Sequence, residues 1–398
     1  MRIRAGSGTE AISRFVYYSN WLLPLAVLGF LYAYAMYPGP AQTPDSRYYM
    51  AAAHSWAATR HLLNPDGTAY VFWGPLYPVL LAAVGAVREP AAAVAALHAL
   101  CLLGSWGGWA WLGRKMLGAD ATWKSVVPWV LALSTPWLLA AKFIWAESVF
   151  LLIFTAYVVA LYSYLTHQQH RWLVLATVAG FLLPLQRTSG LFLLLGTAAG
   201  LLAAYGWQEV RQRHALLAWH LLISLVGGVG WQLWVARSQQ DEPLVLYSQA
   251  AWGLQPLSDF SFVLARWVVP LPVPTAAVSW AYLLAGAVML CLLVLGACNI
   301  GRFGWVMLAM VATYISWHVV AHVMSRGAAG LHDGERYAGV VFGPVMLLLF
   351  GAVRAVAGRH PRWLLVLLGL WLTYPAARAV RNSIFLHQIP IIASATSK

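Results

Sequence analysis

The chain has 398 residues, of which 61% are hydrophobic and only 9% are charged. A water-soluble domain of this size is not expected to have that balance, so the composition excludes a soluble enzyme or a soluble binding module. The formal net charge is +13, but the basic residues occur singly between apolar runs, which argues against a nucleic-acid-binding domain.

The N-terminal segment runs from a basic start into a long apolar stretch, NWLLPLAVLGFLYAYAMY, without a small-residue cleavage site. We interpret it as a retained membrane anchor. Runs of about 17 to 25 residues are long enough to cross a bilayer. The sequence predicts an all-α polytopic membrane protein, one transmembrane domain over residues 1–398. About eleven spans are expected, near residues 21–37, 92–112, 125–142, 148–165, 172–186, 190–205, 215–235, 277–297, 304–323, 338–353 and 363–377.

The segment after the first span, residues 38–90, holds charged and aromatic residues where a short turn would suffice. In TPDSRYYMAAAHSW, Thr43 can cap a helix that begins at Pro44, which places Asp45 in the first turn. The run PLYPVLLAAVGAV, residues 75–87, is short for a span, so we expect an interfacial helix there. On the residues alone, Asp45 could also serve only to complement the helix dipole.

The basic residues test this topology. When residues 75–87 are not counted as a span, short loops such as GRKMLGADATWKS and AGRHPRW fall on the cytoplasmic side, as the positive-inside rule requires. The N-terminus is then inside. Segments of mixed charge fall outside, and the longest after the first loop can fold over the membrane face as a lid. These outer segments are residues 38–90, 237–276 (the expected lid), 324–337 and the tail 378–398.

Other ionisable residues stand at the outer ends of predicted spans. Glu147 in AKFIWAESVFLLIF begins a span, where an acid beside hydrocarbon is costly and is a functional candidate by default. Pairing with Lys142 is the structural alternative. Arg187 in FLLPLQRTSG and Arg336 in HDGERYAGVV either extend to lipid headgroups or bind a lipid-linked phosphate.

Histidines near the last outer loop give a weak indication of a metal site. His318 and His322 are four residues apart and share a helix face, and His332 follows in the loop. No cofactor is implied by the sequence, and a divalent metal stays an open alternative. The sequence contains no GxxxxGK[ST] loop, no CxxC pair and no GxSxG elbow, so nucleotide hydrolysis is not expected.

Five segments taken in order resemble the C-superfamily (GT-C) membrane glycosyltransferases, and most closely the branch of protein O-mannosyltransferases and aminoarabinose transferases. The similarity extends over residues 15–350, and it depends on order, spacing and sidedness because each motif is loose. After the last span only AARAVRNSIFLHQIPIIASATSK follows, where larger members have a soluble domain, so the acceptor is not implied. The segments are PDSRYY, WGPLYPVLLA, AESVFLLIF, GFLLPLQRTSGLFLLL and GERYAGVVFGPVMLLL.

The resemblance implies transfer of a sugar from a polyprenyl-phosphate donor to a lipid, glycan or protein, on the outer face of the bacterial cytoplasmic membrane. Asp45 matches the base that deprotonates the acceptor hydroxyl in one inverting displacement, and Glu147 matches a second acid. The residues expected near the carrier phosphate are Arg187, Arg336, Arg47 and Arg60. Candidates for the substrate pocket, which stand beside these in the sequence, are Tyr48, Tyr49, Lys142 and Tyr337.

Two other classes of protein fit part of the pattern. A transporter or flippase would also be polytopic, but it predicts charges at mid-depth and broken helices in two matching halves. Here the candidate charges gather on one side and no internal repeat is evident. A glycan polymerase or ligase of related architecture would use a lipid-linked oligosaccharide, and the sequence does not distinguish donor size.

Overall fold

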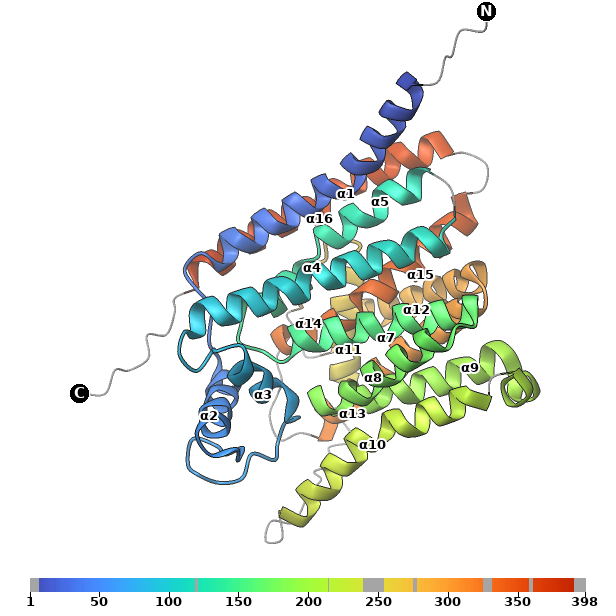
Figure 1. Cartoon of the computed structure of the whole chain (residues 1–398). Coiled ribbons are helices and arrows are strands. Elements are labelled where there is room, and N and C mark those ends of the chain that lie inside the picture. Colours follow the sequence, from blue (N-terminus) through green and yellow to red (C-terminus); the bar gives the residue numbers. More distant parts are fainter. Residues whose placement is uncertain are drawn as a thin grey trace, which may run out of the picture.

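The computed structural model describes residues 7–118, 121–213, 215–238, 254–274, 278–324, 331–357 and 361–389. Within these ranges the chain is a bundle of helices, with isolated β-bridges as its only extended pairing (Figure 1). Among the described residues, eight helical segments are long and apolar enough to cross a membrane. These are Pro90–Met116, Trp123–Lys142, Glu147–His167, Gly190–Gln212, Leu216–Ser238, Trp280–Ile300, Arg302–Val323 and Gly334–Val356.

The remaining three predicted spans are helical as well. The apolar part of α1 (Ser7–Met36) is Asn20–Met36, and α8 (His170–Gln186) has 17 residues, so both are at the lower limit of length for a span. Helix α16 (Pro361–Gln388) is long but less apolar, and it continues well beyond the predicted end at residue 377. The prediction of an all-α polytopic membrane protein is confirmed.

The other helices complete the bundle, and their bounds follow in chain order. Helix α1 packs along α16, so the first and last of the described helices lie side by side (Figure 1). The bounds are α2 (Pro44–Thr59), α3 (Leu76–Ala83), α4 (Pro90–Met116), α5 (Ala121–Ala132), α6 (Thr135–Lys142), α7 (Glu147–His167), α9 (Gly190–Arg213), α10 (Ala215–Ser238), α11 (Leu254–Arg266), α12 (Trp280–Ile300), α13 (Arg302–Met324), α14 (Leu331–Ala338), the 3-10 turn Gly339–Val341 and α15 (Phe342–Ala357).

The centre of the bundle is formed by α7 and α15, whose residues are mostly buried, whereas α10 and α12 are largely exposed on the outside. Glycines allow the closest helix contacts. A Cβ on Gly296 of α12 would lie 1.8 Å from the carbonyl oxygen of Leu348 on α15, so these two backbones touch only because residue 296 has no side chain. A Cβ on Gly343 would likewise meet the ring of Trp109.

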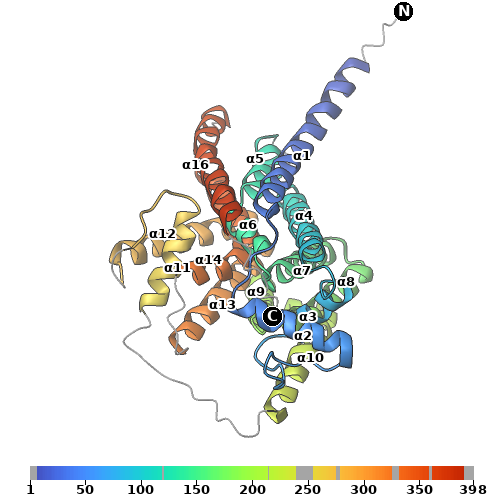
Figure 2. The same cartoon turned by 90° about the vertical axis from the view of Figure 1, so that its left-hand side faces the viewer.

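The segment between α1 and α4 forms two short helices at one end of the bundle. Helices α2 and α3 pack on each other, and Figure 2 shows them on the side that faces the viewer. Helix α3 has eight residues, in agreement with the expectation that this run is too short for a span. Of the lid expected in residues 237–276, residues 239–253, 275 and 276 lie outside the described ranges, and residues 254–266 form α11.

Candidate active site

Asp45 lies in the first turn of α2, as the capping pattern predicts. The N–H of Thr43 donates to Ser46 Oγ at 3.0 Å, which satisfies the helix start. The same hydroxyl donates to the carbonyl of Ile144 at 3.0 Å, and Trp145 Nε1 donates to Thr43 Oγ1 at 2.8 Å. The first turn of α2 is thereby attached to the segment that leads into α7, and Asp45 comes to the N-terminus of α7.

Lys142 anchors the beginning of the loop that carries α2. Its Nζ is buried and donates to the carbonyls of Ala35 at 2.8 Å and Gly39 at 2.7 Å, where α1 ends. Helix C-termini leave such carbonyls without partners in the helix, and a cation there also opposes the helix dipole. A parallel bridge between Ala41 and Phe143 adds to this attachment. Lys142, predicted in the substrate pocket or paired with Glu147, is here bonded to backbone carbonyls.

Four charged side chains meet beside this attachment, and we call them the charge cluster: Asp45, Glu147, Arg187 and Arg336. Glu147, the first residue of α7, is 1% exposed, and its Oε1 accepts a hydrogen bond from Nε of Arg336 and contacts Nη1 of Arg187. Arg336 Nη1 also donates to Asp45 Oδ2 at 2.8 Å. Two carboxylates thus face two guanidiniums, which is the arrangement that makes buried charges tolerable.

Arg187 follows directly after α8, and the loop before α3 holds that helix end in place. A Cβ on Gly74 would lie 2.2 Å from the carbonyl oxygen of Leu185, so the loop reaches the end of α8 because residue 74 is glycine. Gln186 Nε2 donates to the carbonyl of Ala146 at 2.9 Å, which joins the end of α8 to the start of α7. Burial alone would lower the pKa of Arg187, but the neighbouring carboxylate outweighs it and the pKa lies above its usual value.

Aromatic rings enclose the two guanidiniums. The Arg336 guanidinium lies 4.1 Å from the ring centre of Trp145 and 5.3 Å from that of Tyr337, and Arg187 lies 5.1 Å from the ring of Tyr337. Contacts of this kind favour cations that are withdrawn from water. Tyr337 therefore lies beside the cluster, where the sequence placed it, whereas Trp145 was not singled out.

Tyrosines of the α2–α3 region cover another side of the cluster. Tyr49 is buried, and its ring packs edge-on against Tyr77 at 5.0 Å between ring centres. Burial raises the pKa of the Tyr49 hydroxyl, so this group stays neutral next to the charged residues. Tyr77 Oη donates to His98 Nε2 at 2.9 Å, because the other ring nitrogen, Nδ1, must donate to the carbonyl of Ala141 at 2.9 Å. Tyr77 and His98 were not predicted, since nothing in their sequence surroundings distinguishes them from core residues.

Three further predicted site residues, Arg47, Arg60 and Tyr48, lie at the exposed surface of the α2–α3 region. Arg47 is exposed on α2. Arg60 is exposed at the C-cap of α2, where its backbone is left-handed with φ of 63°, and its guanidinium lies 5.9 Å from the ring of Trp56. Tyr48 is partly exposed and packs on Trp73 at 5.1 Å. These side chains line the rim of the α2–α3 region and do not join the paired charges.

The histidines considered for a metal pack among aromatic rings. His318 stacks on Tyr337 at 4.7 Å and meets Tyr314 edge-on at 4.6 Å, and His322 Nδ1 donates to the carbonyl of His318 at 2.7 Å. The side chain of His332 lies outside the described residues. Within the part of the chain that the structure describes, no group of three or more His, Cys, Asp or Glu residues is placed to hold a metal ion.

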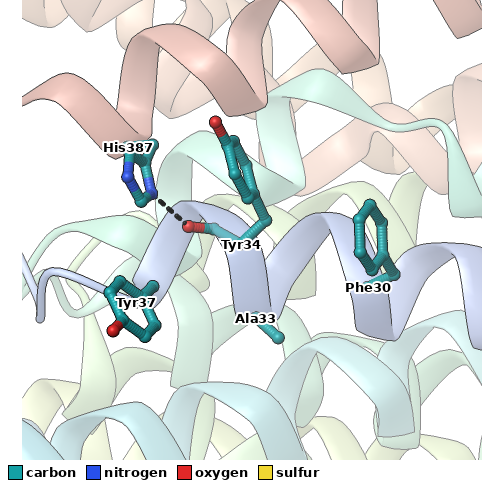
Figure 3. Close-up of a pocket in the computed structure, with 5 residues that line it drawn as sticks. All are labelled: Phe30, Ala33, Tyr34, Tyr37 and His387. Atoms are coloured by element: carbon teal, nitrogen blue, oxygen red, sulfur yellow. Dashed lines mark hydrogen bonds between the residues drawn. The ribbon is translucent and has the colours of Figure 1, made fainter.

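A separate apolar groove of about 410 Å³ lies between α1 and α16 and contains none of the predicted site residues (Figure 3). Its rings form a ladder in which Tyr34 stacks on Phe30 at 6.4 Å and on His387 at 4.4 Å. His387 Nδ1 donates to the carbonyl of Tyr34 at 2.8 Å and so ties the end of α16 to the end of α1. The contacts of His387 with Tyr34 therefore join α1 and α16 at this groove.

The described helices form the fold of a polytopic all-α membrane protein, and solved structures share that fold. One protein with a similar fold is ArnT from Cupriavidus metallidurans, whose crystal structure bound to undecaprenyl phosphate matches with a TM-score of 0.58 and 16% identity, over 92% of this chain and 69% of that one. The apo structure of the same protein matches with a TM-score of 0.56 and 17% identity, over 86% and 60% of the two chains. No protein-family model matches the sequence, and no curated protein matches it.

Proposed function

We propose that this chain is a glycosyltransferase that moves a sugar, a hexose or a pentose, from a polyprenyl-phosphate carrier to an acceptor hydroxyl on a lipid, glycan or protein. The observation that carries the proposal is the Arg336 guanidinium bridging two acids from distant parts of the sequence, Asp45 and Glu147. A fold shared with a protein crystallised with undecaprenyl phosphate supports the choice of carrier.

Arg187 and Arg336 are the proposed ligands of the carrier phosphate. Guanidinium groups bind phosphate oxygens through paired, charge-assisted hydrogen bonds. When the bond between the anomeric carbon and the phosphate oxygen breaks, the leaving phosphate gains negative charge, and fixed cations stabilise that charge most at the transition state. Glu147, which is almost fully buried between them, holds the two guanidiniums at a fixed separation.

Asp45 is the proposed base. Its side chain is 27% exposed, against 1% for Glu147, so an acceptor hydroxyl can reach Asp45 but not Glu147 without a rearrangement. The acceptor oxygen attacks the anomeric carbon and its proton passes to Asp45, while the electron pair of the broken bond leaves with the polyprenyl phosphate. The result is one displacement with inversion at the anomeric carbon.

The proposed location is the bacterial cytoplasmic membrane, with the N-terminus inside and the charge cluster facing outward. The distribution of charge among the short loops supports this orientation. A donor bound at that face is consistent with an arginine pair at the end of the bundle, where a phosphate at the membrane surface can meet it while the prenyl chain stays in the bilayer.

The test is sugar transfer by the purified protein in detergent, from labelled polyprenyl-phosphate sugars to membrane extracts, with wild type and Asp45→Asn. Loss of a general base lowers the rate by about 10²- to 10⁴-fold, so Asp45→Asn should lose nearly all transfer. Asp66→Asn is the matched control, because Asp66 lies in the same loop, is fully exposed and only accepts bonds from Thr68. Full transfer by a folded Asp45→Asn protein would disprove the base, and movement of the lipid across liposomes without transfer by wild type would favour a flippase.

A further inference from the structure

An ion pair outside the charge cluster involves the residue next to Arg336. Glu335 on α14 accepts a hydrogen bond from Nη2 of Arg378 on α16, and the two side chains are 16% and 10% exposed. Glu335 and Arg336 are adjacent in sequence, but their side chains contact different parts of the molecule. One contacts the C-terminal helix, and the other contacts the two acids of the cluster.

Arg378 belongs to a row of side chains on α16 that holds the end of α11. Arg378 Nη1 donates to the carbonyl of Arg266 at 3.2 Å, and Tyr374 Oη donates to the same carbonyl at 2.6 Å. One turn earlier, Trp371 Nε1 donates to the carbonyl of Val268 at 2.7 Å. Residues three and four apart share one face of a helix, so this face of α16 is fixed against α11 before Arg378 reaches Glu335.

The geometry of a helix links the two contacts of α14. Successive residues are about 100° apart around the helix axis, so the direction of Glu335 determines the direction of Arg336. Helix α14 continues through the 3-10 turn Gly339–Val341 into α15, so the ion pair of Glu335 lies near the N-terminal end of this helical segment. The C-terminal end of α14 is held where Trp137 Nε1 donates to the carbonyl of Gly339 at 2.9 Å and Tyr314 Oη donates to that of Tyr337 at 3.2 Å.

We propose that Glu335 and Arg378 are positioning residues, which hold α14 at the rotation where Arg336 bridges Asp45 and Glu147. The consequence for activity rests on the proposed function, in which Arg336 binds the carrier phosphate. Without the ion pair, the N-terminal end of α14 loses its contact with α16 and can shift, and a small displacement of Arg336 is enough to cost about 10²-fold in rate.

The experiment measures KM for the polyprenyl-phosphate sugar, kcat, and the Kd for sugar-free polyprenyl phosphate, with Glu335→Gln, Arg378→Met and Arg378→Lys. Glu335→Gln and Arg378→Met should raise KM and Kd by about tenfold or more, and the double variant should be no worse than Arg378→Met alone, because both substitutions remove the ion pair. Arg378→Lys keeps the charge and should recover part of the loss. The matched control is the ion pair of Glu209 with Arg302, 2.9 Å between α9 and α13, and Glu209→Gln should leave KM and Kd unchanged.

Thermal unfolding of the same variants separates failure of this proposal from failure of the proposed function. If Glu335 positions Arg336, the effects of Glu335→Gln and Asp45→Asn on stability are not additive, whereas those of Glu209→Gln and Asp45→Asn are. Additive effects of Glu335→Gln and Asp45→Asn on stability would show that the ion pair is merely structural, and so would KM and Kd values within twofold of the Glu209→Gln control. Either result would overturn the proposal. If wild type neither binds the carrier nor transfers sugar, the proposed function fails, and the coupling in stability still decides the positioning role.

Discussion

Arg336 shows how much one side chain can determine in this protein. It contacts both acids of the charge cluster and packs on Trp145 and Tyr337, so it joins α2, α7 and α14 at one point. Breaking a buried pair by removing one partner is more damaging than its net contribution indicates, because the other charge stays buried. The residues of the cluster should therefore be sensitive in stability as well as in activity.

Glu147→Gln tests this at a single residue. The substitution leaves two guanidiniums next to a neutral amide, and we expect a loss of about 3–5 kcal/mol in the free energy of unfolding together with loss of transfer. Glu209→Gln, whose partner Arg302 is largely exposed, should cost about 0–1 kcal/mol. Reversible unfolding by denaturant in detergent measures both, and equal losses in the two variants would contradict the description of Glu147 as the buried centre of the cluster.

The carboxyl group of Asp259 on α11 should make the stability of the folded chain depend on pH. Partial burial raises the pKa of this carboxyl from 3.8 to about 6, so between these values the folded chain binds a proton that the unfolded chain releases. Its contribution to stability is present at pH 4 and is lost as the pH rises through about 6. Asp259→Asn should remove this dependence, so the variant gains stability relative to wild type from pH 4.5 to pH 7.5. Melting temperatures at the two pH values measure the difference, and a constant offset between wild type and variant would refute it.

At the scale of elements, the sequence predicted the features that depend on local patterns, namely the spans and the start of α2. The spans follow from length and hydropathy, and the start of α2 follows from Thr43 and Pro44. The pairing of Arg336 with Asp45 joins residues 291 positions apart, and no local pattern carries that information. The resemblance indicated Asp45, Glu147 and both arginines of the cluster. The anchoring of Lys142 and the ion pair of Glu335 depend on tertiary packing and could not be read from their neighbours.

Gly74 tests the contact between the loop and α8. Gly74→Ala would bring a methyl group 2.2 Å from one backbone oxygen and 2.7 Å from another, so the loop must withdraw from the end of α8. We expect a loss of about 1–3 kcal/mol in the free energy of unfolding. We also expect a drop in transfer, because the loop contacts the backbone of Leu185 and Gln186, and Arg187 directly follows them. Gly29→Ala is the control, since nothing lies within 4 Å of the added methyl group. Unchanged stability and transfer for Gly74→Ala would show that the loop can shift without moving Arg187.

At the scale of the whole molecule, the charge cluster lies where α2, α7, α8 and α14 meet, at the end of the bundle that also holds α3. The helices themselves could be placed from sequence, but their mutual arrangement depends on backbone contacts such as that of Gly296 with Leu348. The similarity in fold to ArnT from Cupriavidus metallidurans extends over most of the chain at 16% identity, so the architecture is kept while nearly all side chains differ.

The orientation of this bundle in the membrane is open to a direct test. A cysteine at exposed Ala69, between α2 and α3, should react with a membrane-impermeant maleimide added to intact spheroplasts. A cysteine at exposed Gln169, between α7 and α8, should react only after permeabilisation, because the neighbouring Arg171 favours the cytoplasmic side. The reverse pattern would place the charge cluster inside the cell and remove the proposed acceptors.

The separation of paired residues along the chain also has a consequence for biosynthesis. A ribosome that has just made α7 has supplied both acids of the cluster, but Arg336 comes 189 residues after Glu147, and Arg378 belongs to α16, the last of the described helices. During insertion the acids must therefore remain near water until their cations are translated. Helix α16 also completes the ion pair that fixes α14, so the growing chain acquires a finished site only after α16 has been made.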